Sequence, residues 1–311
     1  MRNSSSGLKI IFWAFFIFVA GVAPLYGGIS FSLPQAITNS GHYPAFIAAG
    51  DFNNDGWADF AVLNSLDDYR ASYGITTGSI DIFLNNKNSS FSYKDRGIVC
   101  VTAPCPQNYG AGIYPTFIST ADLNYDGNLD LVALDRDNTN AYILLGKGNG
   151  LFNSSTQPPY VGQSPNSLVM VDINHDGILD LVVANGYYNI VGGKTGSNNI
   201  AVLFGNGDGN FQLAVNYSAG QDPRSIASGD IDGDGNIDIA VANHDSSNIS
   251  ILFSNPNGTL KPAVNYPLSS APLKVITGFF HDNLHVDLAV LTETGVSVLL
   301  NNGNGSFQPE R

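Results

Sequence analysis

The stretch from Gly229 to Val241, GDIDGDGNIDIAV, decides the fold of this chain because its central phrase recurs along the sequence. The nine-residue phrase DIDGDGNID begins at Asp230, and it has three near copies: DFNNDGWAD from Asp51, DLNYDGNLD from Asp122 and DINHDGILD from Asp172. A decayed fifth copy, FFHDNLHVD, begins at Phe279. Successive copies start 71, 50, 58 and 49 residues apart, so the sequence contains five units of roughly the length expected in a repeat array.

The residues around each phrase predict four short β-strands per unit. A proline and a small or apolar stretch such as PRSIASG precede the phrase, and an apolar run such as IAVAN follows it. A second apolar run then leads into an Asn/Gly turn and usually an aromatic residue, as in AVLFGNGDGNF. Apolar runs separated by such turns are typical of hairpins, and four strands repeated around an axis form a β-propeller.

The two ends of the repeat region predict how the ring closes. The segment FSLPQAITNSGHYP, from Phe31 to Pro44, resembles FQLAVNYSAGQDP, from Phe211 to Pro223, which contains the fourth strand of another unit. The last unit stops soon after its NGNGSF turn, before its own fourth strand is complete. We therefore expect one all-β domain over residues 29–311, with five blades of four antiparallel strands closed by the N-terminal strand. An open or partial array from a larger propeller is the alternative.

These phrases resemble the FG-GAP/VCBS repeats that also build the propeller of integrin α-chains. The resemblance rests on GDFNNDGWADFAV, GDIDGDGNIDIAV and the NGDGNF-type turns, and it covers nearly the whole chain after the first residues. It implies a calcium-binding propeller. FG-GAP/VCBS proteins differ widely in function, so the resemblance does not identify a partner.

The Asp-rich phrases are predicted calcium sites. Oxygen-bearing side chains at positions 1, 3, 5 and 9 and a carbonyl at position 7 can surround one hard cation, with Gly at position 6 allowing the tight bend. An EF-hand is excluded because its twelfth position should be Glu, whereas Val62, Ala133, Val183 and Val241 stand there. Asx turns without metal are the alternative. The predicted metal ligands are Asp51, Asn53, Asp55, Trp57, Asp59, Asp122, Asn124, Asp126, Asn128, Asp130, Asp172, Asn174, Asp176, Ile178, Asp180, Asp230, Asp232, Asp234, Asn236 and Asp238.

The fifth copy is expected to hold no ion. It places Phe279, His281 and Asn283 where the other copies have acidic or amide ligands, and it retains only Asp287. His281 and His285 could suggest a transition-metal site, but two histidines alone are more often ordinary surface residues. The sequence therefore predicts four Ca²⁺ sites.

The charge of the chain excludes nucleic acid as an expected partner. Thirteen Lys and Arg stand against 26 Asp and Glu, which gives a formal charge of −13. Chains that bind nucleic acid normally carry a basic surface.

The first 23 residues match a secretory signal peptide. Arg2 and Lys9 precede the apolar run from Ile10 to Ala23, which is short for a membrane-spanning helix. The cleavage position stays open, and an uncleaved membrane anchor is the alternative. The mature chain is therefore expected to be secreted or at the cell surface, without a stable membrane span. Cys100 and Cys105 are then predicted to close a small disulfide ring.

Insertions are expected on the face opposite the Asp-rich loops. They span Ser65 to Gly78, Asp95 to Tyr114 and Tyr187 to Ser197. Loops gathered on one face of a repeat protein often form its recognition surface. The insertions are rich in tyrosine, which suits a recognition surface, although the tyrosine side chains could equally serve to pack the loops. The predicted partner-binding residues are Tyr69, Arg70, Tyr73, Tyr109, Tyr114, Tyr187 and Tyr188.

The leading functional interpretation is an extracellular recognition or adhesion module that binds a protein or a glycan. The alternative is a polysaccharide hydrolase with central carboxylates, and a purely structural surface protein is third. Hydrolysis of glycosides usually needs two carboxylates, and one of them is often Glu. The chain has two Glu residues, and Glu293 is the one that does not lie next to the C-terminus, so a catalytic pair would have to rely largely on Asp. Candidate acids outside the loops include Asp81, Asp135, Asp137 and Asp245, whereas the GxSxG motif of serine hydrolases is absent.

Overall fold

The computed structural model of the chain describes residues 44–65, 78–87, 90–98, 114–155, 157–190, 193–281 and 284–311. They all belong to one compact unit, Ile37–Arg311. The predicted signal peptide, the N-terminal segment before Pro44, the Cys100 and Cys105 pair, and Tyr69, Arg70, Tyr73 and Tyr109 lie outside the described residues. The described residues contain no helix with the length and apolar character needed to cross a membrane.

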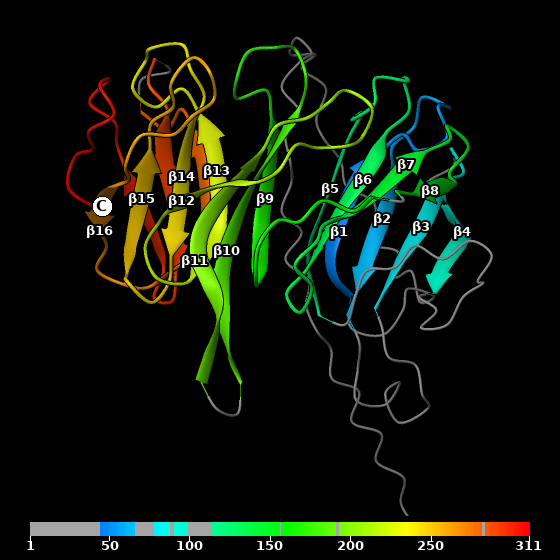
Figure 1. Ribbon diagram of the computed structural model, residues 1–311, viewed down its shortest axis with the longest axis horizontal. Helices are drawn as coiled ribbons and strands as arrows, with labels where there is room; N and C mark the ends of the chain where they lie inside the picture. Colours follow the sequence, from blue (N-terminus) through cyan, green and yellow to red (C-terminus); the bar gives the residue numbers. More distant parts are fainter. Residues whose placement is uncertain are drawn as a thin grey trace, which may run out of the picture. The chain divides into compact units, whose positions relative to one another are not determined.

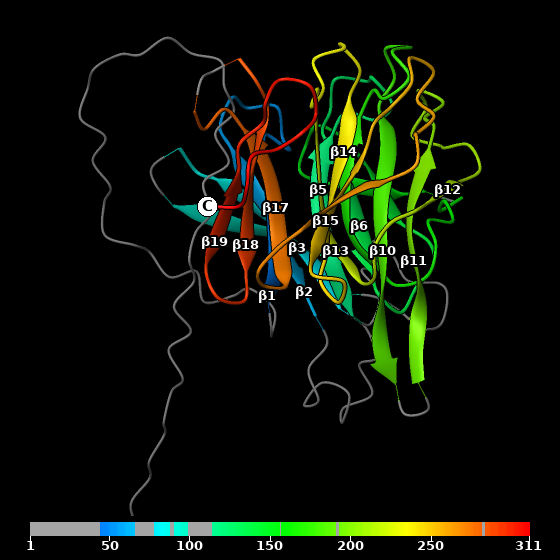
Figure 2. The same cartoon turned by 90° about the vertical axis from the view of Figure 1, so that its left-hand side faces the viewer.

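Nineteen strands form five separate antiparallel sheets in the described part of the chain (Figures 1 and 2). The first sheet contains β1 (Pro44–Gly50), β2 (Asp59–Asn64), β3 (Ser79–Asn85) and β4 (Phe91–Ile98). The second contains β5 (Pro115–Ala121), β6 (Asp130–Asp135), β7 (Tyr142–Gly146) and β8 (Phe152–Ser154). The third contains β9 (Pro165–Val171), β10 (Asp180–Ile190), β11 (Gly193–Leu203) and β12 (Val215–Ser218). The fourth contains β13 (Pro223–Gly229), β14 (Asp238–Asn243), β15 (Asn248–Leu252) and β16 (Val264–Pro267), and the fifth contains β17 (Pro272–Gly278), β18 (Asp287–Thr292) and β19 (Val296–Leu299).

In every sheet the strands pair in sequence order, so each sheet is an antiparallel meander. Its first strand is an edge strand, and the Asp-rich phrase lies in the turn to its second strand. This is the blade that the sequence predicts.

The first strands of the five sheets lie side by side around a common centre. Side-chain hydrogen bonds join successive first strands: Thr116 Oγ1 donates to Pro165 O at 2.8 Å, and Asn166 Nδ2 donates to Pro223 O at 2.8 Å. Val275 N donates to Ser225 Oγ at 3.2 Å, which joins β17 to β13. The Lys274 ammonium lies 5.6 Å from the centre of the Phe46 ring, so β17 also contacts β1. Phe46 of β1 also packs against Phe117 of β5, with ring centres 5.5 Å apart. Each first strand therefore contacts two others, and the five sheets form a ring, as the prediction of a five-bladed propeller requires.

The apolar runs of the sequence form the packing between blades. The second strands are largely buried, and β6 and β14 are buried at every residue, because neighbouring sheets cover them on both faces. Ile82 of the first sheet and Leu131 of the second belong to one buried cluster, and Leu134 and Leu203 similarly join the second and third sheets. Continuous rather than alternating apolar runs are the expected pattern for strands buried on both faces.

Two features differ from the sequence prediction. The segment from Tyr187 to Ser197 is not a loop: β10 and β11 continue through it as paired strands that extend beyond the rest of their sheet (Figures 1 and 2). Similarly, β4 continues to Ile98 through the start of the predicted insertion at Asp95. In both places, pairing to a neighbouring strand satisfies the backbone polar groups that a loop would expose.

In the fifth sheet the end of the chain begins the fourth strand. Val298 N donates to Arg311 O at 3.0 Å and Arg311 N donates to Val298 O at 3.2 Å, so Arg311 pairs with β19. The prediction that the N-terminal segment completes this sheet concerns residues before Pro44, outside the described ranges.

Candidate functional site

The Asp-rich turns are shaped by their own side chains. In the second blade, Asp122 accepts hydrogen bonds from Asp126 N at 3.2 Å and Gly127 N at 2.9 Å, and Asp126 Oδ1 accepts from Asn128 N at 2.8 Å. The first and third blades repeat this pattern. The fourth residue of each turn has a positive φ, for example 58° at Tyr125. The sixth is glycine, with φ 85° at Gly127, where a side chain would be strained.

The ninth residue of each phrase is a buried aspartate that ties the turn to the sheet. Asp130 Oδ2 accepts from Leu123 N at 2.8 Å and Asp130 Oδ1 accepts from Gly146 N at 2.7 Å. Burial raises the pKa of Asp130, Asp180 and Asp238 to about 6, although the backbone hydrogen bonds to each carboxylate act in the opposite direction. Burial also raises the pKa of Asp59. Each of these carboxylates therefore lies where its negative charge is unfavourable unless a cation is nearby.

The fourth turn brings three carboxylates together. Oxygen atoms of Asp230, Asp232 and Asp238 all lie within 4.8 Å of one another. Burial, followed by the neighbouring Asp234 carboxylate, raises the pKa of Asp232. These donors are all oxygens, so the residues fit a hard cation such as Ca²⁺. In the other three turns the third position is Asn rather than Asp. In the second and third turns the side-chain amide of this Asn donates a hydrogen bond to the aspartate at the fifth position.

In the fifth copy a histidine lies against the ninth-position carboxylate. His281 Nδ1 is 2.8 Å from Asp287 Oδ2, which also accepts from Phe280 N at 2.9 Å. Burial acts to raise the pKa of Asp287, but the hydrogen bonds from His281, Asn301 N and Phe280 N outweigh it, so the pKa lies below its usual value. At this turn a contact with an imidazole therefore accompanies the buried carboxylate, where the other copies have additional oxygen-bearing side chains.

A cavity of about 540 Å³ lies at the opposite ends of the first strands. Each first strand leads from this end to its Asp-rich turn over seven residues, a distance of roughly 20 Å at 3.3 Å per residue. The cavity is lined by residues from four of the five blades: Thr116, Arg136, Asn166, Tyr187, Asp222, Arg224, Asp245 and Leu273. Its lining is mostly polar and contains both signs of charge.

The lining residues occupy recurring positions of the repeat. Thr116, Asn166, Arg224 and Leu273 each follow the proline that begins a first strand. Arg136 comes one residue after β6 and Asp245 two residues after β14, whereas Tyr187 lies within β10, next to the register shift that follows Asn185. The repeat therefore directs equivalent first-strand positions, and neighbouring second-strand positions, of successive blades towards one cavity.

Hydrogen bonds and ion pairs fix the charged side chains of the cavity. Asp222 is 2% exposed and accepts from Arg224 Nε at 2.7 Å and from Tyr187 N at 3.3 Å. The Tyr187 hydroxyl donates to Asp245 Oδ2. These contacts link the third blade, which carries Tyr187, to the fourth.

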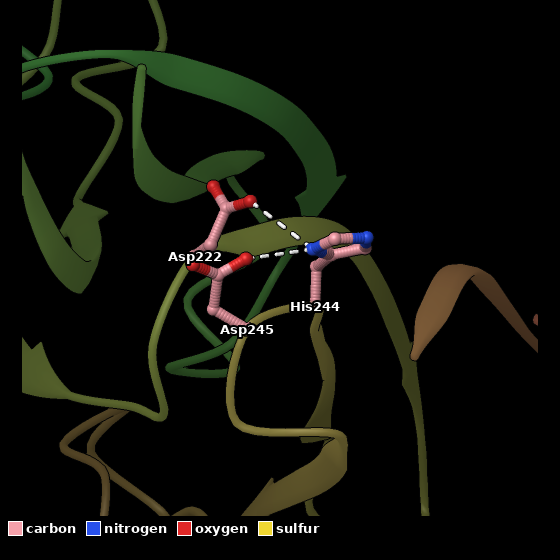
Figure 3. Close-up of side chains that lie close together, drawn as sticks. All are labelled: Asp222, His244 and Asp245. Carbon is pink, nitrogen blue, oxygen red and sulfur yellow. Dashed lines mark hydrogen bonds and ion pairs between the residues drawn. The ribbon is translucent and has the colours of Figure 1, made fainter. Parts of the chain in front are cut away.

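His244 completes a second group of potential metal ligands beside this cavity (Figure 3). Its Nδ1 lies 2.8 Å from Asp245 Oδ1 and 3.7 Å from Asp222 Oδ2. The ligand atoms of all three residues are within 4.8 Å of one another. The group joins the residues that precede β13 to those that follow β14.

The structure brings together only part of the predicted partner surface. Tyr187 lines the cavity, and Tyr114 lies beside it, with the Arg136 guanidinium 5.2 Å from the centre of its ring. Tyr188 belongs to β10, but its side chain is outside the described part. Sequence reasoning missed Arg136, Asp222, Arg224 and His244 as site residues. For Arg224 the sequence did contain a usable signal. A proline marks the start of each first strand, and the residue after that proline lines the cavity in four blades.

Three solved structures resemble the chain in fold. They are an Agrocybe aegerita lectin that recognises non-reducing terminal N-acetylglucosamine, a Lactobacillus plantarum protein and the periplasmic gluconolactonase PpgL of Pseudomonas aeruginosa. Their TM-scores are 0.54, 0.54 and 0.52, at 17%, 13% and 13% identity. The similar regions cover 86%, 86% and 85% of this chain and 66%, 70% and 69% of those chains. At such identities the similarity establishes the fold alone.

The sequence comparisons identify the repeats. An FG-GAP-like repeat model matches residues 122–183 and 184–241, and an FG-GAP repeat model matches residues 164–203. No curated protein matches the chain. The matched residues include three complete Asp-rich turns, Asp122–Asp130, Asp172–Asp180 and Asp230–Asp238, which are elements that the fold repeats from blade to blade. Residues 122–241 of this chain are therefore FG-GAP and FG-GAP-like repeats of the VCBS type, within a β-propeller of five sheets.

Proposed function

We propose that this protein is an extracellular recognition module that binds a glycan in the cavity at the centre of its propeller. Calcium in the Asp-rich turns stabilises the opposite face. The ligand surface and the metal turns thus occupy opposite ends of the same strands, and each can change without disturbing the other.

The observation that carries this proposal is the divergence of the cavity positions between repeats. The residue after the first-strand proline is Ala45, Thr116, Asn166, Arg224 and Leu273 in the five blades. In contrast, the ninth position of the Asp-rich phrase is aspartate in all five copies. The ninth-position aspartate repeats because it holds the same turn in every blade, whereas one asymmetric ligand at the axis would meet a different contact from each blade. The cavity therefore has the pattern of a recognition site.

The lining suits a polar ligand of sugar size. Ligand cavities are typically roughly 300–1,000 Å³, and about 540 Å³ lies within that range. Leu273 is the single aliphatic residue among the eight lining residues in the described ranges, while Asn166, Arg224 and Asp245 can exchange hydrogen bonds with hydroxyl groups. Tyr187 offers an aromatic ring. The similar fold of a lectin for terminal N-acetylglucosamine supports the idea that such a propeller can present a glycan site.

Secretion and calcium binding belong to the same proposal. The apolar run from Ile10 to Ala23 supports export of the chain, and millimolar free calcium is available outside cells. The raised pKa values of Asp130, Asp180 and Asp238 support a cation in their turns. Recovery of the protein from culture medium or from the cell surface tests export, and N-terminal sequencing tests removal of the signal. A chain found inside the cells alone contradicts export, and an exported chain that keeps residues 1–23 contradicts cleavage.

A glycan array followed by titration calorimetry tests recognition. We expect binding of a defined glycan set by the calcium-loaded chain and a loss of roughly tenfold or more in affinity, about 1.4 kcal/mol, for Tyr187→Ala. Trp57→Ala is the matched control, because Trp57 is also a half-exposed aromatic residue but lies in the first Asp-rich turn, on the opposite face. Both variants should keep the β-rich circular dichroism spectrum. Equal loss in the two variants, or an array without binding, would refute the proposal.

The hydrolase alternative has one observation in its favour. Asp222 and Asp245 are two carboxylates near the axis, with oxygen atoms within 4.8 Å of each other. However, Asp222 is 2% exposed and paired with Arg224, so a glycosidic bond would have little access to it. Turnover of a polysaccharide that Asp245→Asn abolishes while leaving its binding intact would favour hydrolysis over recognition.

A further inference from the structure

His244 is placed between three carboxylates at the edge of the axial cavity. Its Nδ1 faces Asp245 Oδ1 at 2.8 Å and Asp222 Oδ2 at 3.7 Å (Figure 3). On the other side of the ring, Nε2 is 3.1 Å from Glu293 Oε1. The three acids come from different places: Asp222 precedes β13, Asp245 follows β14 and Glu293 follows β18. The fold of the ring, rather than a local motif, brings them to one imidazole.

This arrangement suits a positive charge beside the imidazole. A neutral imidazole carries one N–H, so it can donate to Glu293 through Nε2 or to Asp245 through Nδ1, but not to both at once. When the N–H is on Nε2, the lone pair of Nδ1 faces two carboxylates, and a metal ion between them removes the repulsion. Metal-binding histidines commonly donate their other N–H to a carboxylate in this way, which orients the ring and strengthens it as a ligand.

We propose that Asp222, His244 Nδ1 and Asp245 form a binding site for a divalent transition-metal ion of the zinc class. The site is separate from the Asp-rich turns and goes beyond the proposed glycan recognition. One imidazole nitrogen with two carboxylate oxygens suits Zn²⁺ better than Ca²⁺, which takes oxygen ligands only. Asp222 and Asp245 both line the cavity, so the ion lies at its wall.

The observed spacing needs only small side-chain movements to hold such an ion. Ligand atoms about 2.0–2.2 Å from zinc in a tetrahedral site are roughly 3.3–3.6 Å apart. The distances from Nδ1, 2.8 and 3.7 Å, lie on either side of this range. The side chain of Asp222 is 3% exposed and that of His244 is 16% exposed, so the ligands are held by their surroundings.

Arg224 is the competitor for the metal. Its Nε is 2.7 Å from Asp222 Oδ2, and its side chain is 40% exposed. An ion at the site must share this carboxylate with the guanidinium or displace it towards solvent. Removing the guanidinium therefore strengthens metal binding, whereas it would weaken a cluster that served only as an ion-pair network.

Zinc titration of the mature chain, with calcium at millimolar concentration to fill the Asp-rich turns, tests the site without any glycan. We expect one zinc ion per chain by calorimetry and by metal analysis after dialysis. His244→Gln and Asp245→Asn should each weaken binding roughly tenfold or more, and Arg224→Gln should tighten it. His175→Asn is the matched control, since it removes a histidine from the third Asp-rich turn at a positive φ, 60°, that Asn tolerates.

The ¹⁵N shifts of the His244 ring give a second measurement that does not depend on how the variants fold. Zinc should change the Nδ1 shift of the wild-type chain and leave Nε2 protonated. The proposal is overturned by a ring that stays protonated on both nitrogens in excess zinc, by the absence of zinc binding, or by equal affinity in wild type and His244→Gln. A chain that binds zinc but no glycan would contradict the proposed function and leave the metal site standing.

Discussion

Without bound cations, this protein should be more stable at pH 5 than at pH 7.5, and calcium should reverse that order. The prediction comes from Asp130, Asp180 and Asp238, which have a pKa of about 6 in the folded chain, against 3.8 for an ordinary aspartate carboxyl. Because the folded pKa is the higher one, the folded chain binds more protons than the unfolded chain at pH values between and around these two pKa values. Its free energy of unfolding therefore falls as the pH rises from about 4 through 6.

The size of the effect follows from these pKa values. Each carboxyl loses about 1.4 kcal/mol of its contribution to the free energy of unfolding between pH 5 and pH 7.5, so three independent carboxyls lose about 4 kcal/mol. All three are fully buried, with 0% exposure, so screening by water reduces this little. For a propeller of this size the change corresponds to a decrease of about 8 °C in Tm. A cation beside each carboxylate removes the penalty, since it favours the ionised form.

Thermal unfolding followed by circular dichroism measures this effect in protein stripped of metal on a chelating resin. Asp180→Asn should reduce the pH dependence of Tm by about a third, because one of three equal contributions disappears. Asp287→Asn is the matched control: its carboxyl holds the same position in the fifth copy, but its pKa is lowered, so its contribution is already complete at pH 5. A stripped chain whose Tm rises between pH 5 and pH 7.5, or whose Tm at pH 7.5 is insensitive to calcium, would refute the reasoning.

Three further experiments test the scaffold. Leu181→Ala should destabilise the chain by roughly 3 kcal/mol in urea unfolding, because Leu181 is 0% exposed between blades, whereas Leu213→Ala, at 90% exposure, should change stability by less than about 0.5 kcal/mol. Gly205→Ala should lower the free energy of unfolding by roughly 2 kcal/mol, since a Cβ there would lie 2.3 Å from Leu179 O. Gly295→Ala is the control, because a Cβ there meets no atom within 4 Å and the change should be near neutral. Similar losses of stability in both variants would contradict this account. His281→Gln should make the chain unfold at a higher pH during acid titration, because it removes a hydrogen bond that lowers the pKa of Asp287; an unchanged acid midpoint would show that His281 does not hold this turn.

The parts of the fold that could be predicted are those determined by local chemistry. The turn from Asp122 to Asp130 is held by hydrogen bonds within nine residues, so its sequence alone specifies its shape. The apolar runs beside it become strands buried on both faces. In a ring of five such units, every sheet packs between two neighbouring sheets, so both of its apolar faces are covered. Fold and turns were predictable because each copy repeats the same local information.

The extension of β10 and β11 was hidden by composition. The segment from Tyr187 to Ser197 contains Gly, Asn and Ser, which usually indicate a loop. In the structure it pairs as two strands, with Tyr188 opposite Thr195 and Asn189 opposite Lys194. Cross-strand pairing is a property of two segments together, and the propensity of either one alone does not reveal it.

The second metal group could not be predicted for a related reason. Asp222 and His244 are 22 positions apart in sequence, and Glu293 is a further 49 positions along. Their meeting depends on where the ring places the ends of three strands. Single acids and a lone histidine in loops are common, so the sequence contains no pattern that distinguishes these residues from other surface groups.

Comparison of the repeats with one another supplies the information that single motifs lack. Once the strands are known, a residue in one blade can be compared with the residues at the equivalent position of the other four blades. A position either has the same residue type in all blades or differs between them. The ninth position of the phrase is aspartate in every blade and serves the scaffold, whereas the counterparts of His244 are Ser65, Arg136, Gly186 and Glu293. Five equal residues around an axis would make a symmetric surface that cannot orient an asymmetric ligand. These five differ in charge and size, and Arg136 is the one that lines the axial cavity, with Glu293 3.1 Å from His244 beside it, so the proposed site would have a single orientation instead of five equal ones.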